Sequence, residues 1–267
     1  MTQDTAARVI AHEAERLSDL LASCSPDTPV LTCPGWTAKD LLWHVAGVHR
    51  FWAEVLRQDP EASQVQAIES GAPDEPTTID AMLPVRAAWT AALCEQLDVL
   101  GDATPRWSWY PKEQTVGFTR RMQLAEATMH RVDAELTAGQ GIMSLQPEVG
   151  QAVAHHAITV MHDLEPRLPW LPPGGQLTDH GTVGIEATDC DAQWLAGVRS
   201  YAWQAEDGQV NTVWGFAPQS EGAAAATVRG TLPQLALWLW SRPAEVTVAG
   251  DGAVLAAITA LHEAGVQ

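Results

Sequence analysis

The sequence has few basic residues and almost no lysine. Its 267 residues carry 33 acidic and 15 basic side chains, for a formal net charge of −18, and lysine occurs only as Lys39 and Lys112. A chain this acidic repels the phosphates of nucleic acids and the headgroups of anionic membranes. The charge therefore argues against nucleic acid and membrane partners.

Paired cysteines and long apolar runs are also missing. The N-terminal stretch lacks the basic start and apolar block of a signal peptide, and no apolar run approaches the roughly 20 residues that a membrane-spanning helix needs. The four cysteines show no C-x-x-C spacing and no close pairing: Cys24, Cys33, Cys94 and Cys190. We therefore expect a cytoplasmic protein with reduced thiols, and we interpret Cys33 as structural rather than nucleophilic.

What the sequence does contain, in its first part, is a series of amphipathic helical patterns. Apolar residues recur at helical spacing in five segments: residues 4–23, 38–56, 79–100, 120–135 and 147–165. Thr37, followed three residues later by Asp40, is the predicted N-cap of the second of these helices. Helices of this length with apolar stripes predict an antiparallel four-helix bundle.

A break in composition separates these helices from the rest of the chain. The segment EPRLPWLPPGGQLTDHG is rich in proline and glycine, which marks a boundary. Beyond it, short β patterns (TVGIEATD, SYAWQAED, AAATVRG and EVTVAGD) accompany two helical patterns, LPQLALWLWSR and DGAVLAAITALHEAG. The predicted fold class is therefore α plus α+β, with a helical bundle over residues 1–168 and a small α+β domain over residues 176–267.

Acidic and imidazole side chains on the helix RRMQLAEATMHRVDAE point to metal chemistry. Glu126 and His130 lie one turn apart on one strip, with Asp133 beside them. Such a strip can aim a carboxylate oxygen and an imidazole nitrogen at one ion. His44 or His49, which flank the apolar stripe of the helix at 38–56, would supply a third ligand, and helical spacing does not choose between them. Three protein ligands leave a coordination position open, as catalytic sites do.

Two blocks of the sequence resemble the mycothiol-dependent maleylpyruvate isomerase family. The first is PVLTCPGWTAKDLLWHVAGVH, and the second is the RRMQLAEATMHRVDAE helix. The C-terminal run TVRGTLPQLALWLWSRPAEVTVAGD is similar to that family's second domain, so the likeness covers nearly the whole chain. The resemblance implies a DinB-like metal-binding bundle followed by a domain similar to sterol-carrier-protein folds.

The resemblance also implies roles for individual residues. His44, Glu126 and His130 would bind the metal, which is Zn²⁺ or another divalent ion. Asp133 would orient a ligand imidazole or, alternatively, be a solvated surface acid. Arg242 would face the substrate and pair with a carboxylate, although a serine replaces the glycine usual just before it.

The function that the resemblance implies is thiol-dependent catalysis. The metal would bind a small thiol, most simply mycothiol, and hold it as the thiolate. The thiolate would then isomerise an unsaturated acid, by adding to its activated double bond and leaving again, or be transferred to a small electrophile. Thiol exchange in specialised metabolism and a non-catalytic metal- or thiol-binding protein are the alternatives. The identities of the electrophile and the metal stay open, as does the choice between monomer and homodimer.

Aromatic residues stand out in the loop GDATPRWSWYPKEQT, which precedes the metal-binding helix. Trp107, Trp109 and Tyr110 would line the thiol-binding pocket or anchor the loop, and the sequence leaves both interpretations open. The histidines of the helix at 147–165 are interpreted as exposed or hydrogen-bonded rather than as a second metal site: His155, His156 and His162.

Overall fold

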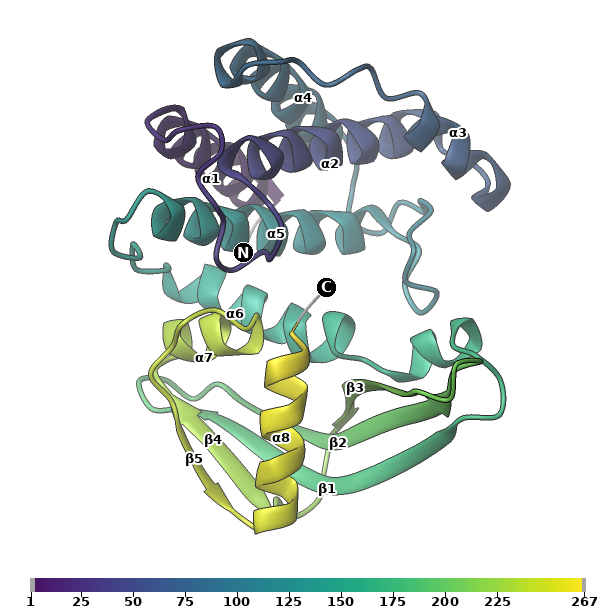
Figure 1. Ribbon diagram of the computed structural model, residues 1–267. Coiled ribbons are helices and arrows are strands. Elements are labelled where there is room, and N and C mark those ends of the chain that lie inside the picture. Colours follow the sequence, from purple (N-terminus) through teal and green to yellow (C-terminus); the bar gives the residue numbers. More distant parts are fainter. Residues whose placement is uncertain (1–2, 266–267) are drawn as a thin grey trace. The chain divides into compact units, whose positions relative to one another are not determined.

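The computed structural model describes residues 3–265 and divides into two compact units, with the division between Ser144 and Leu145 (Figure 1). Helices make up most of the first unit, and a mixed sheet lies in the second. This arrangement confirms the predicted α plus α+β fold class. Across residues 3–265, no helix has both the length and the hydropathy of a membrane span.

Four helices form the bundle of the first unit: α1 (Gln3–Ala22), α2 (Ala38–Gln58), α4 (Ile79–Val99) and α5 (Val116–Thr137). Each of α1 and α2 packs against both α4 and α5. The connection between α2 and α4 contains a 3-10 turn (Ala62–Gln64) and the short helix α3 (Val65–Ser70), neither of which the sequence pattern predicts. The bundle core contains leucines of α1 and α2 together with Met82 of α4.

Threonine caps fix where three of these helices begin. Thr37 forms a capping box with Asp40: Thr37 Oγ1 accepts from the Asp40 backbone N–H at 3.3 Å, and Asp40 Oδ2 accepts from the Thr37 N–H at 2.8 Å. Thr78 and Thr115 cap α4 and α5 through the same kind of side-chain acceptor. These caps satisfy N–H groups that would otherwise lack partners. The predicted N-cap of α2 is therefore confirmed.

A buried ion-pair network fixes the second half of α5. The fully buried Arg131 donates from Nε to Glu13 and from Nη1 to Glu135, both at 2.6 Å. Nη1 also donates to the carbonyl oxygen of Met143 at 3.2 Å. Because removing one partner of a buried ion pair is costly, this network holds α5 firmly against α1 at the turn that carries His130.

The second unit is built on a five-stranded sheet with the order β3-β2-β1-β4-β5. Its strands are β1 (Gln176–Ala187), β2 (Gln193–Gln204), β3 (Val210–Gln219), β4 (Ala226–Gly230) and β5 (Thr247–Gly250). Neighbouring strands are antiparallel except for the parallel pair β1 and β4. Helix α8 (Gly252–Ala264) packs against β1, β2 and β3, and α7 (Leu232–Leu239) packs against α6 (Pro147–His156).

The helix predicted at 147–165 differs from the observed one in length and in partner. Helix α6 ends at His156 and continues as a π-helical turn over Ala157–Met161, and it belongs to the second unit. Trp240 Nε1 donates to the carbonyl oxygen of Val153 at 3.2 Å, which ties α6 to the end of α7. The unit division thus lies at residue 144 and differs from the predicted boundary at 169–175. An apolar stripe indicates that one face of a helix is buried, but it does not indicate which element packs against that face.

Strand β3 is absent from the sequence-based description. The segment SYAWQAED contains the end of β2, at Gln204, and the start of the turn that follows. Strand β3 pairs with β2 from Gln204↔Val210 onward. The turn between them contains Asp207, whose Oδ1 accepts from the Gln209 N–H at 2.9 Å, and Gly208 with φ of +84°. An Asp-Gly dipeptide between two β patterns is a hairpin signal, so the sequence did carry the information.

Candidate metal centre

Two helices of the bundle bring three ligand-type side chains together. Glu126 and His130 come from α5, and His44 comes from α2. Their potential ligand atoms all lie within 4.8 Å of one another, and all three side chains are partly buried. His130 Nε2 is 3.3 Å from Glu126 Oε2. The three predicted ligands therefore share one site, and their binding of a metal stays a prediction.

Asp133 holds the imidazole of His130 from its other side. The Asp133 Oδ2 atom is 2.9 Å from His130 Nδ1, and the Asp133 side chain is 0% exposed, which does not fit a solvated surface acid. Burial lowers the pKa of His130, but hydrogen bonds to Asp133, Cys33 and Glu126 outweigh it and raise this pKa well above its ordinary value. If Nε2 bound an ion, Nδ1 would keep its proton and donate a hydrogen bond to Asp133.

His44 packs among rings and is neutral. Its ring lies edge-on to that of His130 with 4.9 Å between centroids, and the Trp36 ring lies 4.6 Å away on a tilted plane. Burial, and then the charge of His130, lower the pKa of His44 to about 4. Because a metal binds the neutral imidazole, His44 is held in the protonation state that a ligand needs.

His49, the other histidine that the α2 pattern offered, makes a different contact. Its side chain is buried, and its Nδ1 lies 2.8 Å from Thr90 Oγ1. Burial lowers the pKa of His49 to about 3. Among the described residues, the ligand-type clusters contain His44 and not His49. Geometry thus makes the choice that helical spacing left open.

The donor set fits a divalent transition metal. Two imidazole nitrogens and one carboxylate oxygen are the ligands of many catalytic zinc sites, and other divalent ions accept the same set. Ligand atoms around a tetrahedral zinc ion are roughly 3.4 Å apart, and the separation of the Glu126 and His130 atoms is 3.3 Å. Three protein ligands leave one coordination position for a further donor.

A thiol lies beside both Asp133 and His130. Cys33 Sγ donates to Asp133 Oδ2 at 3.7 Å, and this is the oxygen that also contacts His130 Nδ1. Cys33, His130 and Asp133 form a second cluster of ligand-type residues in the described part of the chain. Sequence patterns could not reveal this contact, because Cys33 and Asp133 are 100 positions apart.

Two further polar residues extend the strip along α5 and were missed by the sequence reasoning. Thr119 and Gln123 are both 0% exposed. Thr119 Oγ1 and both amide atoms of Gln123 have no hydrogen-bond partner among residues 3–265. Helical geometry places Thr119, Gln123, Glu126 and His130 on one face. Their spacing of four, three and four residues was the signal available in the sequence.

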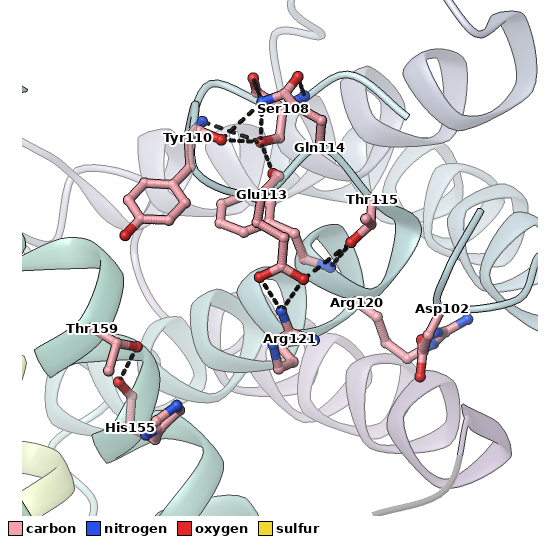
Figure 2. Close-up of polar contacts among 11 residues, drawn as sticks. Asp102, Ser108, Tyr110, Glu113, Gln114, Thr115, Arg120, Arg121, His155 and Thr159 are labelled. Carbon is pink, nitrogen blue, oxygen red and sulfur yellow. Dashed lines mark hydrogen bonds and ion pairs between the residues drawn. The ribbon is translucent and has the colours of Figure 1, made fainter. Parts of the chain in front are cut away.

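The aromatic loop before α5 is held by its own polar contacts (Figure 2). Gln114 Nε2 donates to the carbonyl oxygens of Ser108 and Tyr110, both at 2.8 Å, and Ser108 Oγ donates to that of Glu113 at 2.7 Å. The Glu113 carboxylate accepts from Arg121 Nη2 at 2.6 and 2.5 Å. The loop is therefore closed upon itself and joined to the first turns of α5.

The predicted pocket residues of this loop make packing contacts. The rings of Trp109 and Tyr110 lie 5.6 and 5.5 Å from that of the fully buried Phe118. Trp107 stacks on Trp52 of α2 with 5.9 Å between centroids. These contacts are those of loop anchors, and a role in binding the thiol stays a prediction.

Arg242 lies in the second unit, on the turn after α7. Its side chain is buried, and Nη1 donates to the carbonyl oxygen of Trp240 at 2.6 Å. The preceding Ser241 has φ of +57°, a conformation that favours glycine, and its Oγ donates to the carbonyl oxygen of His262 at 3.2 Å. The serine therefore adopts the backbone shape for which a glycine is usual, and the role of Arg242 stays a prediction.

Two of the three later histidines, His155 and His162, make hydrogen bonds, as expected. His162 is buried and donates from Nε2 to the carbonyl oxygen of Leu239 at 2.7 Å. His155 is exposed, and its Nδ1 accepts from Trp194 Nε1 at 3.3 Å. Among the described residues, the ligand-type clusters include none of His155, His156 and His162.

Comparison with known proteins finds a family match in the helical part of the chain. Residues 7–135 match the family model described as the mycothiol maleylpyruvate isomerase N-terminal domain. A crystal structure of the mycothiol-dependent maleylpyruvate isomerase superposes with a TM-score of 0.60 at 12% identity, covering 94% of this chain and 95% of that chain. A mutant of that isomerase gives 0.61 at 11% identity with the same coverage. This likeness shows the fold of the chain. The search of curated proteins found no sequence that matches this chain.

Proposed function

We propose that the protein is a metal-dependent enzyme that uses a low-molecular-weight thiol. The proposal starts from the match of residues 7–135 to the mycothiol maleylpyruvate isomerase N-terminal domain. The proposed thiol is mycothiol, and the proposed reaction is isomerisation of an unsaturated acid. The observation that carries this proposal is the cluster of His44, Glu126 and His130, which lies within the matched segment. Its open fourth position is where a thiol would bind.

The ligand charges suit an anionic fourth donor. When bound, the metal would lower the pKa of a coordinated thiol and supply a thiolate at neutral pH. Neutral His44 and His130 together with one Glu126 carboxylate would leave a divalent ion with a net positive charge. The Trp36 ring against His44 shields one side from water, and charges attract more strongly where water is excluded.

Arg242 is proposed to bind the carboxylate of the substrate. A guanidinium matches a carboxylate with two parallel hydrogen bonds, which the single ammonium group of lysine cannot reproduce. We expect Arg242→Lys to raise KM for the acid while the metal content stays that of the parent. An unchanged KM would remove Arg242 from the proposal.

Turnover tests the proposed reaction. The metal-loaded protein is incubated with mycothiol and maleylpyruvate, and the products are separated and identified. We expect isomer to form only when thiol and metal are both present. Glu126→Gln should lower the rate more than about 100-fold, since even the outer partners of metal ligands are worth 10–100-fold. Glu15→Gln, an exposed position on α1, is the matched control.

Other products of that assay would change the proposal. Accumulation of a thioether between the thiol and the acid would favour S-transfer over isomerisation. Stoichiometric binding of the thiol without any product would contradict the enzyme and leave a carrier or sensor.

A further inference from the structure

The segment 29–37 forms a compact turn beside the metal centre. Its ends pair through the bridge Pro29↔Thr37. The Val30 N–H donates to the carbonyl oxygen of Trp36 at 2.9 Å, and the Trp36 N–H donates to that of Cys33 at 3.0 Å. Gly35 has φ of +87°, which favours glycine. The backbone therefore fixes where the side chains of this turn lie.

Two of these side chains reach the metal-binding residues. The Trp36 ring lies 4.6 Å from that of His44 and 6.3 Å from that of His130. Cys33 Sγ lies 3.7 Å from Asp133 Oδ2. One turn thus contacts a ligand from each of α2 and α5 and the carboxylate that orients His130.

Hydrogen-bond geometry indicates how the Cys33 thiol can influence His130. The Asp133 oxygen that accepts from Cys33 is the one that contacts His130 Nδ1 at 2.9 Å. A carboxylate oxygen that accepts from two donors is restricted in rotation, and a restricted carboxylate fixes the plane of the imidazole bound to it. Asp133 is fully buried, so the orientation of its carboxylate depends on protein donors rather than on bulk water.

We propose that Cys33 is a positioning residue of the metal centre, which acts through Asp133 and through its own proximity to His130 to hold His130 ready for the metal. This inference rests on the metal centre of the proposed function. Cys33 supplies the S–H donor, Asp133 the shared acceptor oxygen, and His130 the ligand nitrogen. Metal affinity therefore depends on a side chain that does not touch the ion.

Metal affinity of Cys33 variants tests the inference. Zn²⁺ dissociation constants are measured by competition with a chromogenic chelator for the parent, Cys33→Ala and Cys33→Ser. We expect Cys33→Ala to weaken binding about 10-fold, the lower end of the range for partners of metal ligands. Cys33→Ser, which restores a donor, should stay within about threefold of the parent.

Cys24→Ala is the matched control. Cys24 is also half-buried and packs against the same bundle core as Cys33, but its Sγ donates to the carbonyl oxygen of Leu20 at 3.4 Å. We expect parental affinity for this variant. The melting temperatures of the metal-free proteins show whether Cys33→Ala folds as stably as Cys24→Ala, which separates lost positioning from lost packing.

The outcomes distinguish this inference from the proposed function. Parental affinity in Cys33→Ala would overturn the positioning role while the metal centre stands. A sulfur-to-cobalt charge-transfer absorption in the Co²⁺-loaded parent, absent from Cys33→Ser, would also overturn it by making Cys33 a ligand. A parent that binds no metal would overturn both proposals.

Discussion

Neighbouring groups, rather than residue type, distinguish the buried histidines of this protein. His49 and His162 each make a hydrogen bond to a neutral oxygen, and burial lowers their pKa values to about 3 and about 4. His130 is also largely shielded from water, at 12% side-chain exposure, but the carboxylates of Asp133 and Glu126 lie within reach and raise its pKa. Among the residues that the structure describes, an imidazole is part of a candidate metal centre only where carboxylates converge on it.

The buried His162 should make stability pH-dependent. Its pKa falls from 6.5 to about 4 on folding, mainly through burial. The unfolded chain therefore takes up a proton as the pH falls through 6.5, whereas the folded protein resists protonation down to about 4, so stability is lost across this window. We expect His162→Gln, which keeps a donor for the Leu239 carbonyl, to flatten the dependence of melting temperature on pH in that range.

The matched control for that experiment is His155→Gln, since His155 is exposed. It should follow the pH dependence of the parent. Equal slopes in the parent and in His162→Gln would show that the titration of His162 does not contribute.

The buried amide of Gln123, which has no hydrogen-bond partner among the described residues, should lower the stability of the folded protein. A buried polar group without a partner costs about 1–3 kcal/mol, and an apolar group of similar shape removes that cost. We expect Gln123→Leu to raise the free energy of unfolding of the metal-free protein by about 1 kcal/mol. Chemical denaturation measures this, with the exposed Gln151→Leu as the control. A loss of stability in Gln123→Leu would mean that the amide has a partner in solution.

At the scale of elements, the cap of α2 controls the helix that presents His44. The capping box between Thr37 and Asp40 satisfies the free N–H groups at the start of α2. We expect Thr37→Ala to lower the free energy of unfolding by about 1 kcal/mol, while Thr37→Ser retains the acceptor and most of the stability. Denaturant titration measures both. Equal losses in the two variants would show that the side-chain oxygen is not what stabilises the helix start.

Local signals in the sequence predict the elements well. The starts of α2 and of α6 at Pro147 follow from a cap residue and from a proline suited to the first helical turn, and the observed starts agree. Strand β3 could have been predicted from a local signal, because the Asp207–Gly208 turn separates it from the β pattern of β2. The partner of α6 could not be predicted, because Val153 meets Trp240 only in the folded chain.

The same limit applies to the candidate site. Glu126 and His130 could be predicted because one helix places both on one face. His44 could be separated from His49 only by family resemblance and then by geometry. The contact of Cys33 with Asp133 and the unpartnered amide of Gln123 depend on packing between segments far apart in the sequence. Amphipathic periodicity does not encode that packing.

At the scale of the whole molecule, the fold tolerates extensive sequence change. This chain shares the fold of the mycothiol-dependent maleylpyruvate isomerase over 94% of its length at 12% identity. What the fold needs is the period of apolar residues and the caps, which many sequences satisfy. Function must therefore be argued from the site, and the central claim is that α2 and α5 together hold one metal ion.

Metal content tests this claim most directly. The parent, His44→Ala, Glu126→Ala, His130→Ala and a control, His12→Ala on the exposed face of α1, are prepared with metal supplied, and bound metal is measured per chain. We predict about one equivalent in the parent and the control, and a loss in all three ligand variants, because a three-ligand site loses most of its affinity with any one ligand. A parent without metal, or ligand variants that retain it, would contradict the account.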